Sequence, residues 1–85
     1  MEPWMQKLNQ EIGDILGEDR LSHYQITVLP QIFADFFKML KDQPLNKVMK
    51  EQYRMENGEM EIEFSGVKKT NTDVRILEVK ARRVL

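Results

Sequence analysis

The three prolines of this chain each precede an apolar pattern with helical spacing. Proline is tolerated in the first turn of a helix, where its missing N–H would have no partner, and it disrupts a helix interior. Each proline therefore predicts a helix start. The predicted helices run from Pro3 to Leu16, from Pro30 to about Lys41, and from Pro44 to near residues 51–53.

The segment before the second of these helices, residues 24–29, admits two interpretations. Its alternation of Tyr, Ile and Val with other residues is typical of a short strand. Ser22 with Gln25 also resembles a capping box, which would start a helix that is kinked at Pro30. The β-branched residues and the extended preference of a residue that precedes proline favour a strand or extended segment.

After the third predicted helix the apolar period falls to two, which indicates strands. Asn57-Gly58 is a strong hairpin signal because both residues tolerate the positive φ of a type I′ turn. A two-residue loop there would pair Met55 with Met60 and Arg54 with Glu61.

A third strand is predicted over residues 74–82, after a polar connector over 66–72. Its hydrophobic pattern turns Leu77, Val79 and Ala81 inward and pairs Phe64 with Leu77. The fold class is therefore α+β, with three helices followed by an antiparallel hairpin or small meander.

The chain has 85 residues, which is enough for one small globular domain over residues 1–85. It contains no cysteine, which excludes disulfides and thiolate metal sites. No apolar run has the length needed to cross a bilayer, so we expect no membrane partner and a cytoplasmic location.

The sequence contains few residues that suit an enzyme active site. The single histidine, His23, adjoins Ser22, and adjacent residues do not form a base-to-hydroxyl pair without other groups. Glu59, Glu61 and Glu63 share one strand face, but predicted basic neighbours favour cross-strand pairing over metal binding. We predict no catalytic residue, no metal ligand and no cofactor.

Apolar side chains are abundant for so short a chain. The second predicted helix carries Phe33, Phe36 and Phe37, which we expect to include the most buried side chains. The methionines and the first helix add more apolar area than one small core is expected to cover, which would leave an exposed apolar patch. The flexible thioethers of methionine suit adaptable interfaces. The predicted interaction surface comprises Trp4, Met5, Leu8 and Ile12. The first functional hypothesis is a non-catalytic regulatory or adaptor protein that binds a protein partner or a second copy of itself.

The alternative hypothesis is a winged helix-turn-helix protein that binds nucleic acid. The predicted order of helices and hairpin matches that arrangement, in which the third helix enters the major groove and the hairpin loop contacts phosphate. Basic residues also outnumber acidic ones over residues 66–85. The candidate contacts are Asn46, Lys47, Lys50 and Arg54 on the helix and Lys68 and Lys69 on the loop. The acidic strand and a pI near 5.8 oppose tight binding.

Overall fold

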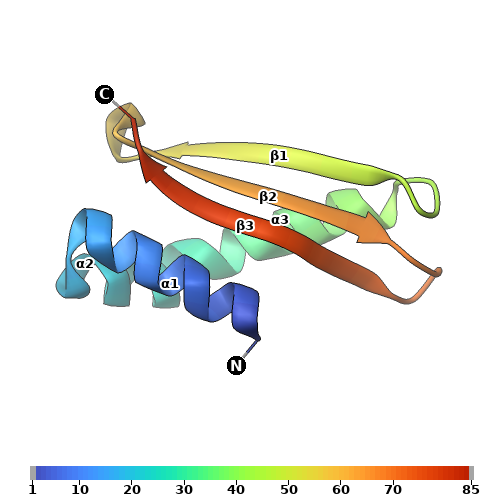
Figure 1. Ribbon diagram of the computed structural model, residues 1–85, viewed down its shortest axis with the longest axis horizontal. Helices are drawn as coiled ribbons and strands as arrows, with labels where there is room; N and C mark the ends of the chain where they lie inside the picture. The colour runs from blue at the N-terminus through green and yellow to red at the C-terminus, as the bar shows by residue number, and fades with distance from the viewer. Residues whose placement is uncertain (1, 85) are drawn as a thin grey trace.

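The structure is a computed structural model that describes residues 2–84. Helices come first and a three-stranded antiparallel sheet follows, in the order β1-β2-β3, which confirms the predicted α+β class (Figure 1). The helical elements are α1 (Pro3–Leu16), α2 (Glu18–His23), a π-helical turn η1 (Tyr24–Val28) and α3 (Leu29–Lys41). The remaining elements are β1 (Val48–Met55), a short turn η2 (Glu56–Gly58), β2 (Met60–Lys68) and β3 (Val74–Arg83).

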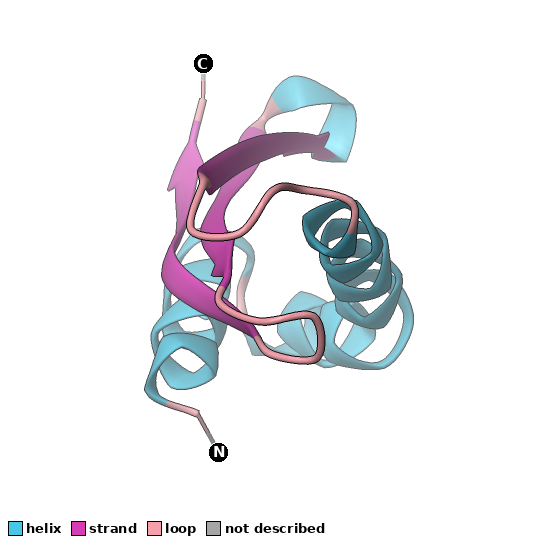
Figure 2. Cartoon of the chain, turned by 90° about the vertical axis from the view of Figure 1, so that its right-hand side faces the viewer, coloured by secondary structure: helices cyan, strands magenta, loops and turns pink. Residues whose placement is uncertain are grey.

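The helices lie on one side of the sheet and leave its other face open (Figure 2). Figure 1 shows α1 along β3 and α3 farther from the viewer, toward β2. We call the two sides the helix face and the open face of the sheet. This two-layer arrangement buries one stripe of α1 and one stripe of α3 against one face of the sheet.

The core forms where α1 packs against β3 and α3 packs against the central strand β2. Leu8 and Ile12 of α1 are completely buried, and Phe36 of α3 is 1 % exposed. Phe36 stacks on Phe64 of β2 with ring centroids 5.4 Å apart. The prediction that the phenylalanines of the second helix include the most buried side chains is confirmed for Phe36, whereas Phe33 and Phe37 pack only partly buried against the core.

The predicted strand over 24–29 is wrong. These residues are helical, and a continuous helical run from Glu18 to Lys41 joins α2, η1 and α3. Burial of Tyr24 and Leu29 against the core overrides the β-branched composition of the segment. The π-helical turn lies just before Pro30, which has no N–H for a regular helical bond, so the widened turn lets the helix continue through the proline.

The predicted third helix is also wrong, because residues 48–55 form strand β1. Asn46 has a left-handed φ of 62°, which cannot continue a right-handed helix from Pro44. The apolar spacing of this segment also suits a helix, as shown by Leu45, Val48, Met49 and Tyr53. In the structure, however, β1 pairs with β2 along its whole length, from Val48↔Val67 to Met55↔Met60. Strand β2 supplies hydrogen-bond partners for the backbone of this segment, and this favours a strand over a helix.

The hairpin at Asn57-Gly58 has the predicted register. Met55 pairs with Met60 and Arg54 with Glu61. Asn57 and Gly58 have φ values of 56° and 89°, and the N–H of Glu59 donates to the carbonyl of Glu56. Strand pairing stops at Met55, so four residues rather than two separate the strands.

The predicted register of β2 and β3 is wrong by two residues. Phe64 pairs with Val79 rather than with Leu77. A register shift between Ser65 and Gly66 leaves Leu77 as an extra residue on β3, and its side chain is 51 % exposed. Gly66 explains the tight fit at this point, because a Cβ there would lie 2.8 Å from a methyl carbon of Leu40.

Candidate functional site

Helix α1 covers only part of the free edge of β3. The Glu11 carboxylate accepts a hydrogen bond from the Ala81 N–H at 2.8 Å. Arg83 donates through Nη2 to the carbonyl of Ile15 at 2.7 Å. These bonds fix α1 against the C-terminal half of the strand, so the hollow space lies beside its N-terminal half, next to the first turn of α1.

Trp4 lies between two hollows in this region. One is bounded by Trp4, Phe37 of α3 and the start of β3 at Val74 and Ile76. The other is bounded by Pro3, Trp4 and Lys7 of α1 and by residues 76–79 of β3. We call the combined surface the Trp4 groove and define it by the apolar side chains of Trp4, Phe37, Val74, Ile76 and Leu77.

The indole of Trp4 is held in place by the core. Its ring meets Phe33 edge to face, with centroids 5.4 Å apart and planes at 86°. Phe33 in turn meets Phe64 of the central strand at 5.6 Å and 81°. Trp4 is nevertheless only half-buried. The groove therefore presents an aromatic surface whose position is already set by packing.

The rim of the Trp4 groove carries charges of both signs. Lys7 and Glu78 border one hollow, while Glu2, Asp73 and Arg75 border the other. Arg75 forms an ion pair with Asp73, with Nε 3.2 Å from Oδ2. Such a rim does not select a partner of a single charge sign.

Two of the four residues predicted as an interaction surface lie where a partner can reach them. Trp4 and Met5 are half-buried, and Met5 borders a third hollow on the other side of α1, with Leu29, Pro30 and Phe33. Leu8 and Ile12 are core residues with no exposed area, because the apolar stripe that they form on α1 packs against the sheet. This part of the prediction is corrected.

The β3 side of the groove was not predicted. The prediction that Leu77 faces inward is wrong. It was based on the alternation of Leu77 with Val79 and Ala81. A bulge in the strand cannot be recognised from alternation alone, because one extra residue reverses every side chain beyond it. The aromatic content of α3 was the only signal for Phe37.

The six predicted nucleic-acid contacts do not form one surface. Asn46 donates through its N–H to the carbonyl of Lys68 at 2.8 Å, and the Lys68 ammonium donates to the carbonyl of Lys41 at 2.7 Å. Asn46, Lys47, Lys68 and Lys69 thus share one end of the sheet. Arg54 lies near the other end of β1, and Lys50 lies between. The recognition helix of a winged arrangement is replaced by a strand.

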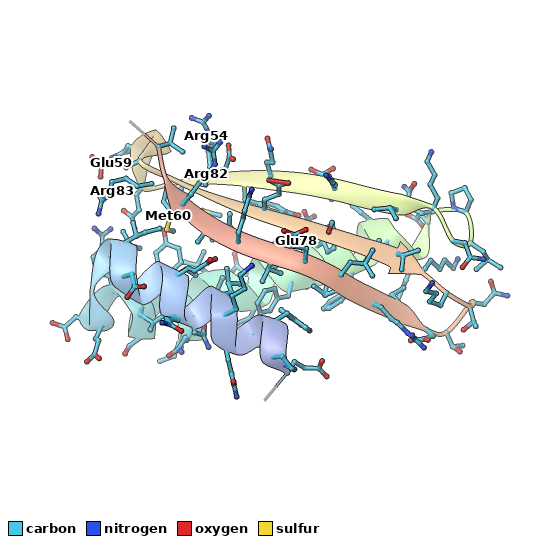
Figure 3. All side chains as sticks on the ribbon, in the orientation of Figure 1. Arg54, Glu59, Met60, Glu78, Arg82 and Arg83 are labelled. Atoms are coloured by element: carbon cyan, nitrogen blue, oxygen red, sulfur yellow. The ribbon has the colours of Figure 1, made fainter. Side chains whose placement is uncertain are left out.

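The open face of the sheet holds a compact ion-pair network. Glu61 is 4 % exposed and lies between Arg54 and Arg82, whose Nε atoms are 3.2 and 3.1 Å from its two oxygens. Figure 3 shows both arginines at the same end of the sheet, with Met60 directed toward the helices. Hydrogen bonds from Arg82 and then Arg54 hold the pKa of Glu61 below its ordinary value. The cross-strand pairing predicted for these acids is therefore present at Glu61.

A second network ties the hairpin turn to the helices. Tyr24 donates to the Glu56 carboxylate at 2.9 Å, and Arg20 forms an ion pair with the same group. Burial, followed by this hydrogen bond, raises the pKa of Tyr24 from 10.0 to about 12. The bond from Tyr24 and the charge of Arg20 lower the pKa of Glu56. These contacts hold the positive φ of 55° that Glu56 adopts.

Ser22 and His23 do not form a nucleophile and base. The Ser22 hydroxyl donates to the carbonyl of Glu18 at 3.2 Å, and His23 Nδ1 lies 3.4 Å from the hydroxyl of Thr27. Within residues 2–84, no three His, Asp or Glu side chains are grouped so that they could hold a metal ion. No helix in that range is both long and apolar enough to cross a bilayer.

Comparison with family models, with curated proteins and with solved structures finds no match for this chain. The Trp4 groove is thus the candidate site on the strength of its geometry alone.

Proposed function

We propose that this protein is a non-catalytic regulatory or adaptor module that acts through protein contacts, with the Trp4 groove as its contact surface and a second copy of the chain as the occupant. The observation that carries the proposal is the position of Leu77. This apolar side chain is 51 % exposed and borders a hollow that is itself lined by Trp4 and Ile76.

The composition of the groove suits a protein partner. Tryptophan and phenylalanine supply large contact areas at interfaces, and positions at which an aromatic ring is already held lose little side-chain entropy on binding. Trp4 is held in this way by Phe33. The charged side chains stand at the rim, as in protein interfaces that have an apolar centre and a polar border.

A second copy fits because the groove offers a projection and a recess on one surface. In a two-fold contact the same patch faces itself, so that each copy can insert Leu77 into the hollow of the other. The mixed charges at the rim support this arrangement, since Lys7 of one copy can face Glu78 of the other.

Sedimentation equilibrium across micromolar to millimolar concentrations tests the proposal. The unmodified chain should form a dimer, because pairing two grooves removes exposed apolar side chains such as Leu77 from water. Leu77→Asp should abolish the dimer by placing a charge in the contact. Leu45→Asp is the matched control, because Leu45 is 52 % exposed and outside the groove, and it should leave the dimer intact.

Two results would contradict the proposal. One is a chain that remains monomeric at millimolar concentration. The other is a dimer that both aspartate variants weaken equally, since association would then depend on general apolar exposure rather than on the Trp4 groove. Circular dichroism of each variant confirms that the fold is retained.

A further inference from the structure

Strand β1 has a free edge along its whole length. It is the outer strand of the order β1-β2-β3, and within residues 2–84 no other strand pairs with its far side. Its register with β2 runs from Val48↔Val67 to Met55↔Met60 without a bulge. A regular edge strand presents a row of backbone N–H and C=O groups that another strand can pair with.

The two faces of β1 differ in chemistry. Lys50, Gln52 and Arg54 point to the open face and are exposed, whereas Met49, Glu51 and Tyr53 point to the helix face and are half-buried. A strand added at this edge would therefore place alternate side chains beside the cations of the open face and, next to Met49 and Tyr53, beside apolar groups of the helix face.

The partner that β1 already has displays this pattern. On β2, Glu61 lies opposite Arg54 and forms an ion pair with it, while Ile62 lies opposite Tyr53 on the helix face. Acidic and apolar residues thus alternate over residues 60–64 of the strand that pairs with one side of β1. The other side of β1 offers the same side chains to a second strand.

We propose that the free edge of β1 binds an extended segment of a partner protein in which acidic and apolar residues alternate. The segment adds to the sheet antiparallel to β1, with its acids beside Lys50 and Arg54 on the open face. Backbone pairing supplies affinity and the side-chain alternation supplies specificity, as in other cases of strand addition.

A second copy of this chain fits the β1 edge poorly in two of the central registers. Antiparallel pairing of two β1 strands centred on Gln52 would place Lys50 opposite Arg54. Centring on Glu51 would place the two Glu51 side chains opposite each other. Like charges directly opposite destabilise a strand pair. These two registers disfavour a second copy, whereas an acidic and apolar segment places no like charge opposite Lys50 or Arg54. This inference does not depend on the Trp4 groove.

The test uses a fluorescently labelled peptide of about ten residues, long enough to pair with the whole of β1, in which valine and glutamate alternate. Fluorescence anisotropy at low ionic strength measures its binding to the intact chain. The same peptide with lysine in place of glutamate serves as the probe control. The acidic peptide should bind, and the basic one should not.

Two charge reversals locate the binding site. Lys50 on β1 and Lys80 on β3 border the same shallow hollow on the open face beside Glu63, so Lys50→Glu and Lys80→Glu change the net charge equally. Lys50→Glu should weaken binding about tenfold, because an attractive cross-strand pair becomes repulsive. Lys80→Glu should change binding much less, since β2 and β1 separate Lys80 from the free edge.

Equal loss in both variants would overturn the inference, because the peptide would then be attracted by overall charge. Absence of binding by the acidic peptide would overturn it as well. Leu77→Asp should leave peptide binding unchanged, so failure of the β1 edge and failure of the Trp4 groove are separate results.

Discussion

The Glu11 carboxylate on α1 accepts a hydrogen bond from the backbone N–H of Ala81 on β3, at 2.8 Å and across 70 residues of sequence. An edge strand has N–H groups that point away from its neighbour and that lack a partner in the ladder. Glu11 satisfies one of these groups and at the same time fixes α1 on the sheet. The position of α1 in turn determines where the Trp4 groove opens.

Replacing Glu11 with alanine should destabilise the fold by about 1–3 kcal/mol, because the part-buried N–H of Ala81 loses its partner. Urea denaturation measures the change. Glu11→Gln keeps a carbonyl acceptor on a side chain of similar length and should recover most of the loss. Equal loss in the two variants would mean that the hydrogen bond itself contributes little.

Phe36→Ala should destabilise the fold by about 3–5 kcal/mol, since it leaves a cavity in the core beside Phe64. Phe37→Ala is the matched control on the same helix, where the ring is only half-buried, and its cost should be clearly smaller. Thermal and urea unfolding of both variants provide the measurement. A Phe36→Ala variant as stable as the unmodified chain would contradict the assignment of the core.

Gly58→Val should destabilise the fold by about 1–3 kcal/mol, because Gly58 has a φ of 89° that β-branched residues avoid. Asn57→Gly should change the stability by less than about 1 kcal/mol, since glycine accepts the φ of 56° found at Asn57. Both are measured by urea unfolding. A neutral Gly58→Val substitution would show that the turn does not require a positive φ.

The free energy of unfolding should fall as the pH rises from 10 toward 12. The pKa of Tyr24 is raised from 10.0 to about 12 in the folded chain. The neutral phenol therefore contributes stability that is complete below pH 10 and is lost as the pH rises through about 12. Tyr53, whose pKa is also raised by burial and by its bond to Asp35, acts in the same direction.

Urea unfolding at several alkaline pH values, with tyrosinate absorbance recorded in parallel, measures this effect. Tyr24→Phe should make the fall shallower, because one of the shifted groups is removed. Tyrosinate formation in the folded chain with the ordinary midpoint of 10.0 would contradict the prediction.

The sequence predicts elements well where a local signal and the tertiary environment agree. Pro3 and Gly17 delimit α1, and the structure places that helix over Pro3–Leu16. Asn57-Gly58 predicts the register of β1 and β2 because only a few residues at a turn set it. The α+β class follows from these two features.

The sequence predicts secondary structure poorly where contacts between distant segments select helix or strand. The apolar spacing over 44–53 fits a helix as well as a strand, and only the presence of β2 as a partner selects the strand. For 24–29, the neighbouring helices and the core select a helix. The bulge at Leu77 has no local signal, so the β3 wall of the candidate site was not predicted, whereas Trp4 on α1 was. Met5, also predicted, borders a different hollow on the other side of α1.

In the proposed dimer, the Trp4 groove binds a second copy of this chain. A dilution series followed by two-dimensional NMR tests it most directly, because backbone amides report contacts residue by residue. If the dimer forms, the resonances of the Val74, Ile76 and Leu77 amides and of the Trp4 indole N–H should shift with concentration. Those of the Lys50 and Gln52 amides on β1 should remain unchanged. Spectra that are identical from micromolar to millimolar concentration, or shifts confined to β1, would contradict it.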